Sequence, residues 1–146
     1  MSGYRNRPKD TAEALRGGFL YTGDIGELDA DGYLFIRDRK KDMVIVGGYN
    51  VYPREVDEVL FTHPAVKEAA STGAPDPYYG ETVRAFVVLN DGAQIGANEL
   101  IDHCEKNLAP YKVPSQIYLI EVLPRTTVGK IDKLALRERL SSPLRA

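Results

Sequence analysis

Residues 123–132 read Leu-Pro-Arg-Thr-Thr-Val-Gly-Lys-Ile-Asp and connect an apolar run to a helix pattern. The run 117–123 is typical of a strand, which the proline interrupts, and a helical spacing of apolar residues begins after Asp132. Gly129 and Lys130 fall in the loop between them. Glycine permits a positive φ and adds no bulk beside the ammonium group. The stretch therefore predicts a strand, a loop that carries Lys130 beside a glycine, and a helix.

Upstream of this stretch, strand patterns alternate with helix patterns. The apolar segments 43–46 and 49–52 flank Gly47-Gly48, which predicts a hairpin. A helix is expected to begin at Pro53, because proline is favoured at the first helical position and Glu55 follows in the first turn. The other expected elements are strands at 66–74, 82–89 and 117–123, a helix capped by Asn98 that buries Cys104, and a final helix that buries Leu134, Leu136 and Leu140.

The first third of the chain has a different character. Its clearest signal is the turn Asp29-Ala30-Asp31-Gly32 between apolar segments, which predicts another hairpin up to residue 36. Six consecutive charged residues follow, at 37–42. We expect a remnant of a larger domain at residues 1–40 and a small α+β domain at residues 41–146. The small domain is predicted to contain a hairpin, a sheet of about three strands and about three helices.

The composition limits the classes of function. The chain has 146 residues and a formal net charge of −2, which gives no electrostatic case for nucleic-acid binding. No apolar run approaches the roughly 20 residues that span a bilayer, and the first residues lack the apolar segment of a secretory signal. One cysteine cannot form an internal disulfide, so we expect a reducing compartment, the cytoplasm.

Four polar features are candidates for a binding or catalytic site. They are Asp24 in the segment Thr22-Gly23-Asp24, Arg39, the Gly47-Gly48 pair and Lys130. Each also has a purely structural interpretation. Asp24 could be a turn residue, Arg39 a solvated charge in a connection, Gly47-Gly48 the turn of a hairpin, and Lys130 a cation on a surface loop. Their order along the chain favours the functional interpretation.

Taken together, these residues and their neighbours resemble the adenylate-forming superfamily, which includes acyl-CoA synthetases and the adenylation domains of nonribosomal peptide synthetases. The resemblance covers nearly the whole chain, and its later motifs are most similar to bacterial fatty-acyl-CoA ligases. The motifs that carry it are Tyr21-Thr22-Gly23-Asp24, Asp38-Arg39-Lys40-Lys41-Asp42, Gly47-Gly48-Tyr49-Asn50-Val51-Tyr52-Pro53, His63-Pro64-Ala65-Val66, Pro75-Asp76-Pro77-Tyr78-Tyr79-Gly80-Glu81 and Gly129-Lys130-Ile131.

The resemblance implies a ligase that joins a fatty acid to coenzyme A through an acyl-AMP intermediate, at the expense of ATP. It assigns Lys130 to the carboxylate and phosphate oxygens as the catalytic residue, and Tyr21, Asp24 and Arg39 to the nucleotide. Gly48 is expected to leave room for the pantetheine arm of coenzyme A. Lys41 matches the hinge about which the small domain swings between the two steps. Val128 stands where many members have a small polar residue.

The resemblance also implies that much of the active site lies outside this chain. In full-length members the phosphate loop, the Mg²⁺-binding glutamate and the acyl pocket precede the position of Tyr4, so no metal ligand is expected here and the chain alone is expected to be inactive. Residues 1–36 are expected to be disordered, to dock on a neighbour or to mediate self-association. The alternatives are an adenylation module that loads a carrier protein and an inert interaction domain of the same fold.

Overall fold

The computed structural model describes residues 1–141, and the last five residues of the expected domain 41–146 lie outside this part. The chain divides into two compact units, residues 1–41 and residues 42–146. The first unit contains helix α1 and two hairpins, so its residues are folded rather than disordered. Its elements are α1 (Pro8–Ala14), β1 (Leu15–Arg16), β2 (Phe19–Leu20), β3 (Asp24–Leu28) and β4 (Leu34–Arg39).

The β3–β4 hairpin has the turn that the sequence predicts. The Asp29 carboxylate accepts hydrogen bonds from the backbone N–H groups of Asp31 and Tyr33, at 3.0 and 2.8 Å. Gly32 has φ +85°, a conformation that glycine adopts without steric cost. Large apolar side chains of this unit are exposed, as expected from the sequence: Phe19, Leu20, Leu34, Phe35 and Ile36.

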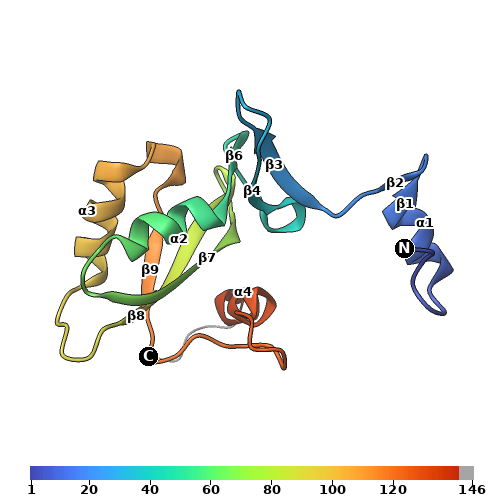
Figure 1. The fold of residues 1–146 in the computed structure, drawn as a ribbon. Helices are drawn as coiled ribbons and strands as arrows, with labels where there is room; N and C mark the ends of the chain where they lie inside the picture. The colour runs from blue at the N-terminus through green and yellow to red at the C-terminus, as the bar shows by residue number, and fades with distance from the viewer. Residues whose placement is uncertain (142–146) are drawn as a thin grey trace. The chain divides into compact units, whose positions relative to one another are not determined.

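The second unit is built on a five-stranded sheet with the order β6-β5-β8-β7, in which β9 also pairs with β8 (Figure 1). β7 and β8 form a long antiparallel pair, and β9 runs parallel to β8. The expected hairpin, β5–β6, joins the sheet through a single pairing of Val46 with Gly80. The strands are β5 (Val44–Val46), β6 (Tyr49–Val51), β7 (Val66–Asp76), β8 (Gly80–Leu89) and β9 (Gln116–Leu119).

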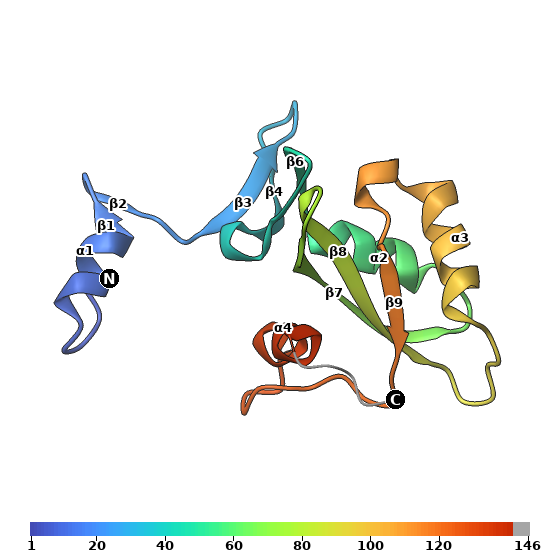
Figure 2. The same ribbon diagram turned by 180° about the vertical axis from the view of Figure 1, so that it is seen from behind.

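Helices cover both faces of this sheet. α2 (Pro53–Phe61) and α3 (Ala97–Asn107) pack on one face, and α4 (Lys133–Ser141) packs on the other, as Figures 1 and 2 show. The short 3-10 helices η1 (Lys40–Asp42) and η2 (Pro110–Lys112) lie in connections. None of the helices within residues 1–141 has the length and hydropathy needed to cross a membrane.

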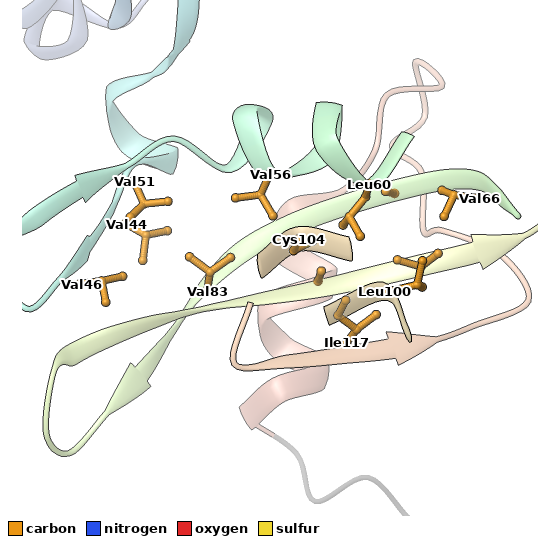
Figure 3. Close-up of a cluster of buried hydrophobic side chains, with 13 residues drawn as sticks. Val44, Val46, Val51, Val56, Leu60, Val66, Val83, Leu100, Cys104 and Ile117 are labelled. Carbon is orange, nitrogen blue, oxygen red and sulfur yellow. The ribbon is translucent and has the colours of Figure 1, made fainter. Parts of the chain in front are cut away.

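The alternation of side chains along β8 produces two apolar clusters. Val83 faces α2 and α3, where it meets Leu60 and Leu100 (Figure 3). Ala85 and Val87 belong to the same cluster. The intervening side chains of β8 face α4 and form a smaller cluster: Phe86 and Val88, with Ala70, Leu123 and Leu136. Because β8 is covered on both faces, its sequence is an almost continuous apolar run.

Three local predictions are wrong. The helix expected to be capped by Asn98 begins two residues earlier, with Gly96 at the N-cap position. The strand expected to reach residue 123 ends at Leu119, because the chain then crosses to the α4 side and buries Leu123 there. Leu134, expected in the core, is 66% exposed, whereas Leu136 is fully buried and Leu140 packs against the smaller apolar cluster on the α4 side of the sheet.

Candidate functional site

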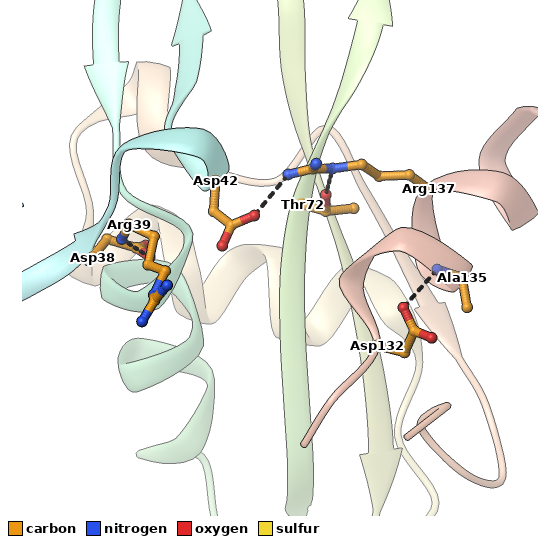
Figure 4. Close-up of polar contacts among 7 residues, drawn as sticks. All are labelled: Asp38, Arg39, Asp42, Thr72, Asp132, Ala135 and Arg137. Carbon is orange, nitrogen blue, oxygen red and sulfur yellow. Dashed lines mark hydrogen bonds and ion pairs between the residues drawn. The ribbon is translucent and has the colours of Figure 1, made fainter. Parts of the chain in front are cut away.

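Asp24 and Arg39 are brought together by the β3–β4 hairpin. The two residues are direct partners across the strands, and Nε of Arg39 lies 3.2 Å from Oδ1 of Asp24. The Asp24 side chain is 27% exposed and the Arg39 side chain 57% exposed, so both remain accessible. The backbone N–H of Arg39 donates to the Asp38 carboxylate at 2.7 Å (Figure 4). The arrangement presents an acidic and a basic group side by side at a strand end.

Tyr21 lies in the same unit, shortly before β3. Its backbone N–H donates to the carbonyl of Ala14 at 2.8 Å. The Arg16 guanidinium lies 4.3 Å from the centre of the Tyr21 ring, which is a cation–π distance. The ring is half exposed, so one face can still contact a ligand.

The expected hinge residue, Lys41, is exposed in η1 and is the last residue of the first unit. The preceding residue is fixed, because the N–H of Lys40 donates to the carbonyl of Gly23 at 2.8 Å. The following residue, Asp42, is also held, by Arg137. A charged residue with an exposed side chain thus lies between two anchored neighbours at the junction of the two units.

Gly47 and Gly48 form the two-residue turn between β5 and β6. Their φ angles are +56° and +88°, as a turn that matches the twist of a hairpin requires. The two positions differ in their surroundings. A Cβ at Gly47 would lie 3.2 Å from the ring of Tyr79, whereas a Cβ at Gly48 would meet nothing within 4 Å. Gly48 therefore borders open space.

A groove of about 940 Å³ runs beside this turn. Sequence reasoning did not single it out, although the tyrosines in the turn-forming segments were a visible signal. The rings of Tyr49 and Tyr111 stack at a centroid distance of 4.6 Å. The remaining lining is mixed apolar and polar, and includes Gly47, Tyr79, Thr82, Ile101, Glu105 and Pro114. Such a groove suits a flexible ligand with a mixed polar and apolar surface.

Lys130 lies on the loop between Leu123 and α4. The loop is closed on itself, because the N–H of Thr126 donates to the carbonyl of Lys130 at 2.7 Å and the N–H of Gly129 donates to the carbonyl of Thr126 at 2.9 Å. The Arg125 guanidinium also donates to the Gly129 carbonyl at 3.0 Å. Lys130 itself is exposed, and within residues 1–141 its ammonium has no hydrogen bond or ion pair. The backbone is fixed while the cation remains available.

Behind the loop, α4 carries a polar contact that no sequence motif predicts. Nε of Arg137 donates to Oγ1 of Thr72 at 2.8 Å, and its Nη2 lies 3.1 Å from Oδ1 of Asp42 (Figure 4). Thr72 is fully buried in β7, and the Asp42 side chain is 15% exposed. The one available signal was the position of Asp42, directly after the expected hinge.

Comparison with known proteins places this geometry in a family. Residues 55–130 match the family described as the AMP-binding enzyme C-terminal domain. The chain is 52% identical over 140 residues to a long-chain-fatty-acid–CoA ligase of Bacillus subtilis. The aligned region covers 96% of this chain and 24% of that protein. It is 45% identical over 136 residues to a 2-succinylbenzoate–CoA ligase of Geobacillus, covering 93% of the chain and 28% of that protein.

Solved structures agree with this result. ATP-bound MatB from Rhodopseudomonas palustris superposes with a TM-score of 0.89 at 38% identity, over 98% of this chain and 29% of that one. The o-succinylbenzoate CoA synthetase of Bacillus subtilis, in complex with its acyl-adenylate intermediate, superposes with a TM-score of 0.87 at 39% identity. The match covers 100% of this chain and 29% of that one. The chain spans about a quarter of the length of its relatives. It belongs to the AMP-binding enzyme C-terminal domain family of adenylate-forming ligases.

Proposed function

We propose that this chain is the C-terminal portion of an acyl-CoA synthetase that converts a fatty acid, ATP and coenzyme A into acyl-CoA through acyl-AMP. Its curated relatives are acid–CoA ligases. The observation that carries the proposal is Lys130, an exposed cation whose ammonium has no partner within the described part of the chain, on a loop whose backbone is cross-linked by hydrogen bonds. The fatty-acid substrate is supported by the similarity to the Bacillus subtilis ligase.

The first step needs a cation of this kind. A carboxylate that attacks the α-phosphate of ATP is repelled by the phosphate charge, and negative charge accumulates on the phosphate oxygens as the bond forms. An ammonium placed at these oxygens in a site that excludes water stabilises the transition state. The fixed loop lowers the reorganisation needed to bring Lys130 there.

The other site residues have roles that suit their surroundings. The neighbouring carboxylate and guanidinium of Asp24 and Arg39 can accept from and donate to the two ribose hydroxyls, which fits a nucleoside. Tyr21 offers a ring face to the same ligand. The pantetheine arm of coenzyme A is proposed to pass Gly48 and to lie along the tyrosine-lined groove. Lys41 is the proposed pivot between the two steps, and Mg²⁺ would bind in the part of the longer relatives that this chain does not cover.

The chain alone is proposed not to bind ATP. Three charge-assisted hydrogen bonds from Asp24, Arg39 and Lys130 would contribute roughly 1.5–3 kcal/mol each. Two of these groups already pair with each other, and association costs roughly 4–15 kcal/mol. The sum is near zero. Isothermal titration calorimetry should detect no binding, and a dissociation constant below about 100 μM, roughly −5.5 kcal/mol, would contradict this expectation.

The activity can be tested in a hybrid enzyme, in which this chain replaces the matching quarter of the Bacillus subtilis long-chain-fatty-acid–CoA ligase. The hybrid should exchange pyrophosphate into ATP in the presence of fatty acids and should form acyl-CoA. The unmodified relative is the control. Transfer to a carrier protein but not to coenzyme A would favour a carrier-loading module, and loss of both steps would favour an inert interaction domain.

Two further properties belong to the same proposal. The exposed apolar side chains of residues 1–36 are proposed to form a contact surface, either with the rest of a longer enzyme or with a second copy. Sedimentation velocity across a concentration series would reveal self-association. We also place the protein in the cytoplasm, because its one cysteine is free and buried.

A further inference from the structure

Arg137 connects two segments that are 95 residues apart in the sequence, α4 and the first residue of the second unit. Its guanidinium uses separate nitrogens for the two contacts, so Thr72 and Asp42 are held at the same time. The Arg137 side chain is 37% exposed, but Thr72 and Asp42 are largely shielded from solvent. Hydrogen bonds between charged groups in such surroundings are stronger than those between exposed groups.

The apolar anchoring of α4 is narrow. Leu136 is its one fully buried side chain within residues 133–140, and Leu134 points to solvent. A helix whose apolar contact is centred on one fully buried residue, with partly buried Leu140 beside it, can rotate about that contact. The neighbouring residue, Arg137, provides a second attachment to β7 and a third to Asp42 (Figure 4). These contacts fix the orientation of α4 on the sheet.

The orientation of α4 determines the placement of the Lys130 loop, because the helix begins two residues after Ile131. Oδ1 of Asp132 accepts from the N–H of Ala135 at 3.1 Å, which ties the end of the loop to the first turn of the helix. The N–H of Asp132 donates in turn to the carbonyl of Pro124 at 2.8 Å, which closes the loop at its base. A rotation of α4 would therefore move the loop.

We propose that Arg137 and Asp42 are positioning residues that couple the pivot at Lys41 to the Lys130 loop. Asp42 follows the pivot directly, so the contact links the point of rotation to the helix that supports the catalytic cation. When the domain turns, Lys130 is carried as part of a rigid body. The catalytic consequence rests on the proposed function, whereas the mechanical link is a property of this chain alone.

The mechanical link can be tested on the 146-residue chain by hydrogen exchange. The substitutions Asp42→Asn and Arg137→Gln should accelerate exchange of the Thr126, Gly129 and Asp132 amides about tenfold, the factor expected when one hydrogen bond to a charged group is lost. The amides of β8 should be unchanged. Arg139→Gln is the matched control, because Arg139 is exposed on the same helix. If Arg137→Gln and Arg139→Gln exchange alike in the loop, the proposal is overturned. Should Arg137→Gln fail to fold, Asp42→Asn decides the question.

The catalytic consequence is tested separately in the hybrid enzyme. Asp42→Asn should lower the rate of acyl-AMP formation while the conversion of preformed acyl-AMP into thioester changes little, because Lys130 acts in the first step. Equal loss in both steps would reduce the contact to a structural role. Faster loop exchange with no activity in the unsubstituted hybrid would contradict the proposed function and leave the mechanical link standing.

Discussion

A leucine in place of Gly48 should separate the two chemical steps. Gly48 has φ +88°, and a Cβ there meets nothing within 4 Å. The substitution therefore costs stability only through the left-handed backbone conformation, about 1–2 kcal/mol. The side chain would fill the open space through which the pantetheine arm is proposed to pass. Because a displacement of about 1 Å from the reactive geometry can lower a rate on the order of 10²-fold, thioester formation should fall by that factor.

Gly92 supplies the matched control for this substitution. It has φ +81°, and a Cβ there would likewise meet nothing within 4 Å, but it lies in the turn after β8, apart from the groove residues. Gly92→Leu should therefore cost similar stability in urea denaturation and leave thioester formation intact.

The assay uses the hybrid enzyme with each step measured alone. Acyl-AMP formation is followed by pyrophosphate release, and thioester formation is followed by mixing preformed acyl-AMP with coenzyme A. Gly48→Leu should preserve the first rate. Equal losses in both steps, or identical behaviour of Gly48→Leu and Gly92→Leu, would refute the assignment of Gly48 to the thiol step.

Three other predictions concern the core, the cysteine and the lysine loop. Leu60→Ala should lower the free energy of unfolding by about 2–5 kcal/mol, whereas Phe61→Ala, at a half-exposed position, should change it by less than about 0.5 kcal/mol; urea denaturation compares them. Burial raises the pKa of the Cys104 thiol to about 11, so its alkylation at neutral pH should be more than about 100-fold slower in the folded than in the unfolded chain. As the pH rises, the thiol ionises in the unfolded chain before it does in the folded chain. The contribution of the buried Cys104 thiol to the free energy of unfolding is therefore complete below about pH 8.5 and is lost as the pH rises towards 11. Urea denaturation at a series of pH values measures this loss. Arg125→Gln removes the donor to the Gly129 carbonyl; acyl-AMP formation in the hybrid should fall about tenfold, and an unchanged rate would contradict a positioning role.

Much of the fold follows from local sequence signals. The proline and glutamate at the start of α2 predict its first turn, and the nearly continuous apolar run predicts the strand β8. The Asn98 prediction failed because asparagine and glycine are both good N-cap residues, and the difference between them is small. The prediction that Leu134 is buried failed because α4 contacts the sheet along a narrow line, which a helical period alone does not reveal.

The site was only partly predictable. The family motifs point to Lys130, Gly48 and the Asp24–Arg39 pair, and the structure places this pair 3.2 Å apart. The contacts that hold the lysine loop depend on pairings far apart in the sequence: Arg125 with Glu68 and Arg137 with Asp42. No local pattern specifies such partners, because they meet only after the sheet and α4 have packed.

The central claim is that the exposed Lys130 ammonium stabilises acyl-AMP formation and has no part in thioester formation. Lys130→Ala in the hybrid enzyme tests it most directly. Acyl-AMP formation should fall by on the order of 10²–10³, the usual effect of removing one electrostatic contact to a transition state, while preformed acyl-AMP should still be converted into acyl-CoA at the unsubstituted rate. An unchanged first step, or an equal loss in both steps, would contradict the account.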